Sequence, residues 1–176
     1  YEISKGIKNF EVKIINARDH AEELYYVACK AYETYPEKYR PDISKENFIN
    51  GVIGWDKYEV YAAFDRKSEK LCGYAWLNVY SDYVDFCVLK ADPSYEKYGI
   101  NAAIVYAIVD KYNKKLGKGF YICDGSRSTL HETNFQDYLE KYFGFRKAYC
   151  KLKIKYRFPI GIIVKMLFPF RRYITS

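Results

Sequence analysis

The segment 83–115 constrains the fold most, because its apolar pattern changes from that of a strand to that of a helix across a short turn. Residues 83–89 form a β-branched and aromatic run, which Asp92-Pro93 interrupts. After this turn, apolar residues recur at four-residue spacing and place one stripe along a helix. The first N–H groups of a helix lack intrahelical partners, so such a turn is a natural binding site for an anion such as phosphate. Gly99, in the first turn, would let a ligand approach the backbone closely.

The remaining chain supplies the elements of a mixed sheet. Strand-like runs cover residues 10–15, 58–64, 71–80, 83–89, 120–123 and 150–156. Helical patterns cover about 20–35, 44–52, 95–115 and 134–143. Short turns between consecutive strands predict an antiparallel meander, and the helix that follows it makes the next strand pair parallel. The sequence therefore predicts an α/β (α+β) fold, with a central mixed, mostly antiparallel sheet of about 6–7 strands flanked by about 4 helices.

Six residues around the central turn form a recognisable motif: Asp92, Pro93, Tyr95, Gly99, Ile100 and Ala103. This pattern resembles the acyl-CoA-binding motif of the GNAT N-acyltransferase superfamily, which reads roughly Val-Asp-Pro-x-Tyr-(Gln/Arg)-x-x-Gly-x-(Gly/Ala). The chain departs from it at Glu96, a carboxylate that would repel a pyrophosphate, and at Asn101, which narrows the approach to the backbone. The segment 134–145 resembles a second GNAT element, a helix that opens near Asn, carries a Tyr and ends in Gly-Phe.

The resemblance implies a GNAT-like fold that uses acetyl-CoA or another acyl-CoA as donor substrate and no metal. Donor binding would fall on the strand end, the turn and the starts of two helices: Leu89, Ala91, Lys97, Tyr98, Gly99, Ile100, Asn101, Ala102 and Asn134. Acceptor contacts would come from the loop between the first two helices and from the loop after residue 123: Tyr32, Tyr35, Tyr39, Arg40 and Arg127. A solvated linker anchored by its aromatic residues is the plainer interpretation of the first loop.

Acyl transfer from a thioester to an amine needs a base for the amine and a proton for the leaving thiolate. Asp85 could be the base, directly or through water; a carboxylate facing solvent is the alternative. Tyr138 could be the acid, because a phenol pKa of about 10 is close to that of a thiol. It stands two positions before Glu140, which occupies the place of the usual GNAT tyrosine. His131, just before the same helix, is an alternative acid–base group or an ordinary helix-start residue.

The positive charge is concentrated at the C-terminal end. The chain carries a formal charge of +7, yet residues 141–176 hold ten Lys or Arg and no Asp or Glu, which leaves residues 1–140 at −3. This distribution argues against a basic nucleic-acid-binding core, so no nucleic acid partner is expected. The basic segment would suit an anionic membrane or an acidic acyl carrier protein. Its lysine-rich strand-like run at 150–156 could equally protect a sheet edge.

The cysteines and the length indicate the setting. Five cysteines, an odd number without Cys-x-x-Cys spacing, indicate free thiols in a reducing cytoplasm. No histidine–cysteine cluster has metal-ligand spacing, and no run reaches the roughly 18 apolar residues of a membrane span. At 176 residues, we expect a single GNAT-like domain over 1–157 and a basic, apolar segment, 158–176, that packs on the domain or lies at a surface.

Two functions remain open. The first is an acyl-CoA-dependent N-acyltransferase, such as an acetyltransferase, acting on the amine of a small molecule. The second is a non-catalytic or altered-donor module, supplied by acyl carrier protein, that binds an anionic partner through its basic C-terminus. The expected location is cytoplasmic, with peripheral contact at the inner membrane face as a variant of either function. The sequence predicts no oligomeric state.

Overall fold

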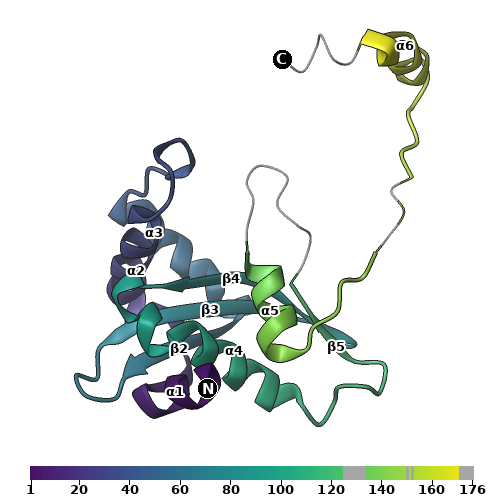
Figure 1. Cartoon of the computed structure of the whole chain (residues 1–176). Helices are drawn as coiled ribbons and strands as arrows, with labels where there is room; N and C mark the ends of the chain where they lie inside the picture. The colour runs from purple at the N-terminus through teal and green to yellow at the C-terminus, as the bar shows by residue number, and fades with distance from the viewer. Residues whose placement is uncertain (125–133, 150, 152, 171–176) are drawn as a thin grey trace. The chain divides into compact units, whose positions relative to one another are not determined.

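The computed structural model describes residues 1–124, 134–149, 151 and 153–170. The chain divides into two units, Tyr1–Gln136 and Asp137–Ser176. The first unit holds a sheet of five strands in the order β1 to β5: β1 (Phe10–Ile15), β2 (Glu59–Asp65), β3 (Leu71–Val79), β4 (Tyr83–Ala91) and β5 (Tyr121–Cys123). Neighbouring strands are antiparallel except for the parallel pair β4 and β5 (Figure 1). The predicted mixed sheet with one parallel crossover is therefore confirmed.

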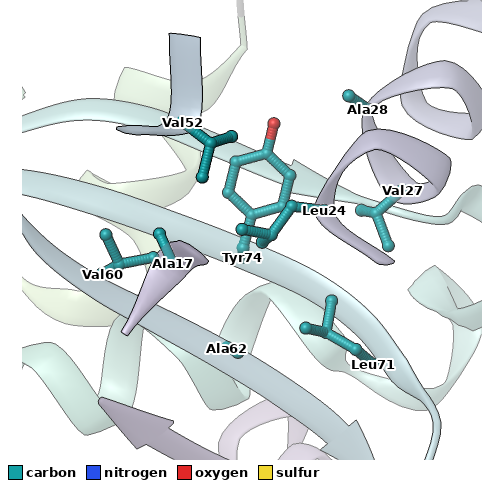
Figure 2. Packing of buried hydrophobic residues seen from close by; sticks show 9 residues of the cluster. All are labelled: Ala17, Leu24, Val27, Ala28, Val52, Val60, Ala62, Leu71 and Tyr74. Atoms are coloured by element: carbon teal, nitrogen blue, oxygen red, sulfur yellow. The ribbon is translucent and has the colours of Figure 1, made fainter. Parts of the chain in front are cut away.

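Helices cover both faces of this sheet. Tyr74 on β3 packs with Leu24 and Val27 of α2 (Ala21–Glu33), as Figure 2 shows. The preceding residue, Gly73, lies against the helix on the opposite face: a Cβ placed on it would be 2.9 Å from Ile100 of α4 (Ile100–Tyr112). Successive strand residues point to opposite faces. Therefore α2 lies on one face of the sheet and α4 on the other.

The face that α2 covers carries the larger apolar cluster. Its buried members come from α2, β2, β3 and the segments beside them: Ala17, Leu24, Val27, Ala28, Val52, Val60, Ala62, Leu71 and Tyr74 (Figure 2). Val52 ends α3 (Lys45–Val52), and Ser44 caps the start of this helix, because its Oγ accepts a hydrogen bond from the Asn47 N–H at 3.2 Å. Short 3₁₀ turns precede α2 (Ala17–His20), follow it (Glu37–Tyr39) and follow α3 (Ile53–Lys57).

A helix before β1 has no counterpart among the predicted elements. This helix, α1 (Glu2–Asn9), packs against the start of α4 and next to β1. Asn9 at its end donates a side-chain hydrogen bond to the Tyr98 carbonyl at 3.2 Å. The sheet face beneath α4 is thus bordered by a second helix near Gly99.

The sheet has fewer strands than the 6–7 that the sequence predicts. The predicted strand 150–156 is the missing one: its described residues, 151 and 153–156, are exposed and belong to no strand. A segment in which lysines alternate with apolar residues is not stable as a strand by itself, because its backbone N–H and C=O groups need a neighbouring strand to pair with. The last strand of the described sheet, β5, has only three residues, so its backbone offers few groups with which a further strand could pair.

The second unit contains most of α5 (Phe135–Phe143), then α6 (Ile160–Leu167) and a 3₁₀ turn (Phe168–Phe170). Lys147 forms ion pairs with Asp137 at 2.9 Å and Glu140 at 3.2 Å, which fold the chain after α5 back onto that helix. Most apolar side chains of α6 are exposed, with Met166 at 68%. In the described parts of the chain, no helix combines the length and the hydropathy that crossing a bilayer requires.

Candidate functional site

The β4 and β5 strands separate after three residue pairs. Their register pairs Tyr83 with Tyr121 and Asp85 with Cys123, and β5 ends there. The stacked rings of Tyr83 and Tyr121, with centroids 5.3 Å apart, hold the paired end together. Beyond Asp85, β4 continues to Ala91 with no strand beside this edge among the described residues. Its outward backbone N–H and C=O groups are therefore available to a ligand that runs along the strand.

A β-bulge lies where this open edge begins. Trp76 on β3 is opposite Val88, whereas the next residue, Leu77, is opposite Phe86, so Cys87 is the extra residue on β4. A bulge interrupts the ladder and redirects backbone and side chains locally. The Cys87 thiol accepts a hydrogen bond from Asn78 Nδ2 at 3.3 Å, and burial raises the pKa of the thiol. Cys87 is thus held as a neutral thiol in the bulge.

Asp85 lies at the point of separation. It is half-buried, and its Oδ1 accepts a hydrogen bond from the Cys123 thiol at 3.3 Å. A second carboxyl group, Asp124, follows β5 directly. Burial raises the pKa of Asp124, the side-chain hydrogen bond with Gln136 opposes this shift, and the nearby charge of Asp85 adds to it. Asp124 was absent from the predicted site residues, and its position at the end of a parallel strand is the signal that could have found it.

The turn before α4, where the sequence predicts an anion-binding site, consists of a 3₁₀ turn followed by the start of α4. Asp92 caps the 3₁₀ turn Pro93–Tyr98, because its Oδ1 accepts hydrogen bonds from the Ser94 N–H and hydroxyl at 3.0 and 2.7 Å. Gly99 then adopts a left-handed conformation with φ 83°, which separates this turn from α4. The first backbone bond of α4 runs from the Ala103 N–H to the Gly99 carbonyl at 3.0 Å. The N–H groups of residues 100–102 precede that bond and point out of the helix start.

Eight of the nine predicted donor-binding residues lie on β4, in this turn or in the first turn of α4. Leu89 and Ala91 lie on β4, and Lys97 and Tyr98 are exposed in the 3₁₀ turn. Ile100 and Ala102 are buried in the first turn of α4, and the buried Oδ1 of Asn101 has no hydrogen-bond partner in the described chain. Asn134, just before α5, is exposed.

The backbone of α1 packs directly against Gly99, in the space that a side chain would fill. A Cβ on Gly99 would lie 3.0 Å from the Glu2 carbonyl oxygen and from the Gly6 nitrogen. A Cβ on Gly6 would lie 2.4 Å from the Gly99 carbonyl oxygen. The side of Gly99 that lacks a side chain is therefore filled by another helix, which corrects the expectation that this space admits a ligand. The amides of the helix start remain the groups that could contact an anion.

Two of the predicted acceptor residues meet at the end of α2. The rings of Tyr32 and Tyr35 are 5.1 Å apart, and Lys90 of β4 lies against both of them. Arg40 donates a hydrogen bond from Nε to the Tyr35 carbonyl at 2.6 Å. Tyr39 is exposed in the 3₁₀ turn after α2, with Lys38 against its ring at 4.6 Å. Lys90 was not predicted, since only the sheet brings it beside α2.

Three further predicted site residues lie outside the described residues or in the second unit. His131 and Arg127 lie outside the described residues. Tyr138 belongs to the second unit, where its ring contacts those of Tyr142 and Phe143 at centroid distances of 5.0 and 5.9 Å. Its role as the general acid therefore stays a prediction.

Comparison with solved structures identifies the architecture. A ribosomal-protein-alanine N-acetyltransferase from Brucella melitensis biovar Abortus has a TM-score of 0.60 at 11% identity, covering 84% of this chain and 99% of its own. An aminoglycoside acetyltransferase from an uncultured soil metagenomic sample, in complex with sisomicin, has a TM-score of 0.56 at 12% identity, with 86% and 99% covered. The chain has the GNAT fold.

A third solved structure has a similar fold. The PaiA N-acetyltransferase from Thermoplasma acidophilum, in complex with coenzyme A, has a TM-score of 0.51 at 20% identity and covers 75% of this chain and 87% of its own. No protein-family model matches the sequence, and no curated protein matches it either. The similarity to GNAT proteins is therefore a similarity of fold, which agrees with the fold predicted from the strand–turn–helix segment.

Proposed function

We propose that this protein is an N-acetyltransferase, which transfers an acyl group from acyl-CoA to the amine of a small molecule. The observation that carries the proposal is the separation of β4 from β5 at Asp85, after which β4 runs on to Ala91 with no strand beside it among the described residues and leads through a 3₁₀ turn to the helix start at Gly99. An extended ligand chain can pair with such an edge, while its phosphates meet the amides at the helix start. Acyl-CoA combines these two features in one molecule.

The residues present fit this donor in most respects. The pantetheine amides would pair with the β4 backbone near Leu89 and Ala91, and the pyrophosphate would accept hydrogen bonds from the amides of residues 100–102. The orphaned Oδ1 of Asn101 offers an acceptor for a ligand N–H. Lys97 is exposed beside the turn and adds positive charge. Glu96, also exposed there, opposes the binding of phosphate.

The carboxylate at the separation point would serve the acceptor amine. Asp85 takes a proton from the ammonium form, and the neutral amine nitrogen then forms a bond to the thioester carbonyl carbon. The carbon–sulfur bond breaks, and the leaving thiolate takes up a proton for which the sequence predicts Tyr138 as the donor. The nitrogen loses its second proton to solvent as the amide forms. Backbone N–H groups at the Cys87 bulge polarise the carbonyl oxygen. Asp124, whose pKa is raised, is a nearby group able to hold a proton in this region.

The proposal is tested first by donor binding and then by turnover. We expect acetyl-CoA to raise the melting temperature in a concentration-dependent way, because a ligand that binds only the native state stabilises it. We also expect free thiol to be released from acetyl-CoA when a panel of small amines is added. Binding without thiol release for any amine would favour the non-catalytic module, and the absence of binding would refute the donor assignment.

Replacing Glu96 with glutamine should tighten the binding of CoA. The substitution removes a like charge beside the phosphates, and because Glu96 is exposed the gain should be modest, about two- to fivefold in Kd. Isothermal titration calorimetry at low salt measures it. Glu46→Gln, an equal change of charge on exposed α3, is the matched control and should leave Kd unchanged. An equal Kd for Glu96→Gln and the wild type would place Glu96 away from the phosphates.

A further inference from the structure

Lys90 occupies an aromatic cage on the face of the sheet that α2 covers. Its ammonium lies 4.2 Å from the ring centroid of Tyr32 and 4.7 Å from that of Tyr35. It also donates a hydrogen bond to the Tyr35 hydroxyl at 2.8 Å. These contacts hold the flexible lysine chain in one position, half-buried beside the end of α2.

This cation has no anionic partner in the described part of the chain. No carboxylate of residues 1–124, 134–149, 151 or 153–170 lies within ion-pair distance of Lys90. Two acids next to these residues in the chain are engaged elsewhere: Glu33, which follows Tyr32, pairs with Lys30 at 2.9 Å, and Asp92, two residues after Lys90, caps the turn through Ser94. Arg40 adds a second positive charge at the Tyr35 carbonyl. A half-buried ammonium held by two rings therefore keeps donor capacity for an anion.

Lys90 points to the same face of the sheet as Asp85. It is paired with Tyr74, whose ring lies in the α2-facing cluster. Trp76 packs against the same cluster, so Asn78, two residues further on, shares its face, and Asp85 is opposite Asn78. Lys90 follows Asp85 by five residues along a strand that the bulge shortens, so at most roughly 16 Å of backbone separates them. An acceptor at Asp85 can therefore extend toward Lys90 along one face.

We propose that Lys90 binds an anionic group of the acceptor, so that the preferred acceptor is an amino carboxylate or short peptide rather than a polycationic amino sugar. This inference rests on the proposed transferase function. An acceptor with a free carboxylate supplies the counter-ion that the described chain lacks, whereas an additional ammonium on an amino sugar would meet Lys90 as a like charge. Tyr32 and Tyr35 then act as the walls that position the lysine.

The test compares acceptors that differ only in the anionic group. Glycylglycine and ω-amino carboxylates are paired with their carboxamide analogues, and an aminoalkyl phosphate distinguishes phosphate from carboxylate recognition. In the wild type, we expect kcat/KM to be about tenfold or more higher for the free carboxylate, because a hydrogen bond to a charged group typically contributes that much to binding. Lys90→Met should remove the preference through KM, and Lys90→Arg should retain most of it. Lys38→Met, which removes an exposed lysine against Tyr39, should leave the preference intact.

The outcomes separate this inference from the proposed function. Equal kcat/KM for carboxylate and carboxamide acceptors, or an equal loss for both in Lys90→Met, would overturn the role of Lys90 while leaving the transferase standing. A preference for the phosphate acceptor alone would overturn the carboxylate assignment. If no amine is acetylated, calorimetric titration of glycylglycine and its amide into the CoA-saturated protein decides: a preference lost in Lys90→Met supports the site, and no preference refutes it.

Discussion

Replacing Gly6 with alanine should detach α1 from α4 and destabilise the first unit by about 2–3 kcal/mol, the usual cost of overpacking. The new Cβ would lie 2.4 Å from the Gly99 carbonyl oxygen and 2.9 Å from the Ala103 nitrogen. Both are backbone atoms of the helix start, so no side-chain rotation can relieve the clash. The melting temperature and the hydrogen exchange of α1 amides measure the effect.

A matched control separates the clash from the ordinary effect of a helical Gly→Ala change. A Cβ on Gly51 in α3 would meet no atom within 4 Å, so Gly51→Ala should be neutral or stabilise by up to about 1 kcal/mol. If Gly6→Ala behaves like Gly51→Ala, then α1 does not pack on Gly99. Because α1 borders the turn where we propose that the phosphates bind, we also expect Gly6→Ala to change the Kd for CoA more than Gly51→Ala does.

Replacing Asp85 with asparagine should lower kcat by about 10²–10⁴-fold, the usual contribution of a general base. Asparagine keeps the size of the side chain but cannot take a proton from the ammonium of the acceptor. The Kd for acetyl-CoA should stay close to that of the wild type, because Asp85 lies at the far end of β4 from the helix start. Assays that follow the release of free thiol at several pH values measure both kcat and its pH dependence.

Two further variants make the assignment of the base specific. Asp82→Asn removes an exposed carboxylate from the turn between β3 and β4 and should leave kcat unchanged. Asp124→Asn tests the neighbouring carboxyl group, whose pKa is raised chiefly by burial. If Asp85→Asn changes KM alone while Asp124→Asn lowers kcat, then Asp124 is the base and Asp85 a binding residue.

The sequence by itself determined the local elements and their order. The strand, the Asp92-Pro93 break and the helix after Gly99 are visible because each pattern lies within one short stretch of the chain. The cap at Ser44 and the antiparallel meander are local in the same sense, since a side chain reaches its own helix start and short turns join neighbouring strands. Together with the motif, these features were enough to predict the GNAT fold.

Only the tertiary structure decided which distant groups meet. The contact between Gly6 and Gly99, and the cage that Tyr32 and Tyr35 form around Lys90, join segments that no periodicity relates. The predicted strand at 150–156 failed for the related reason that an alternating pattern specifies the faces of a strand but not the neighbour that must pair with its backbone. Periodicity is a property of residues that are close in sequence, whereas strand pairing and helix packing depend on the free energy of bringing remote segments together.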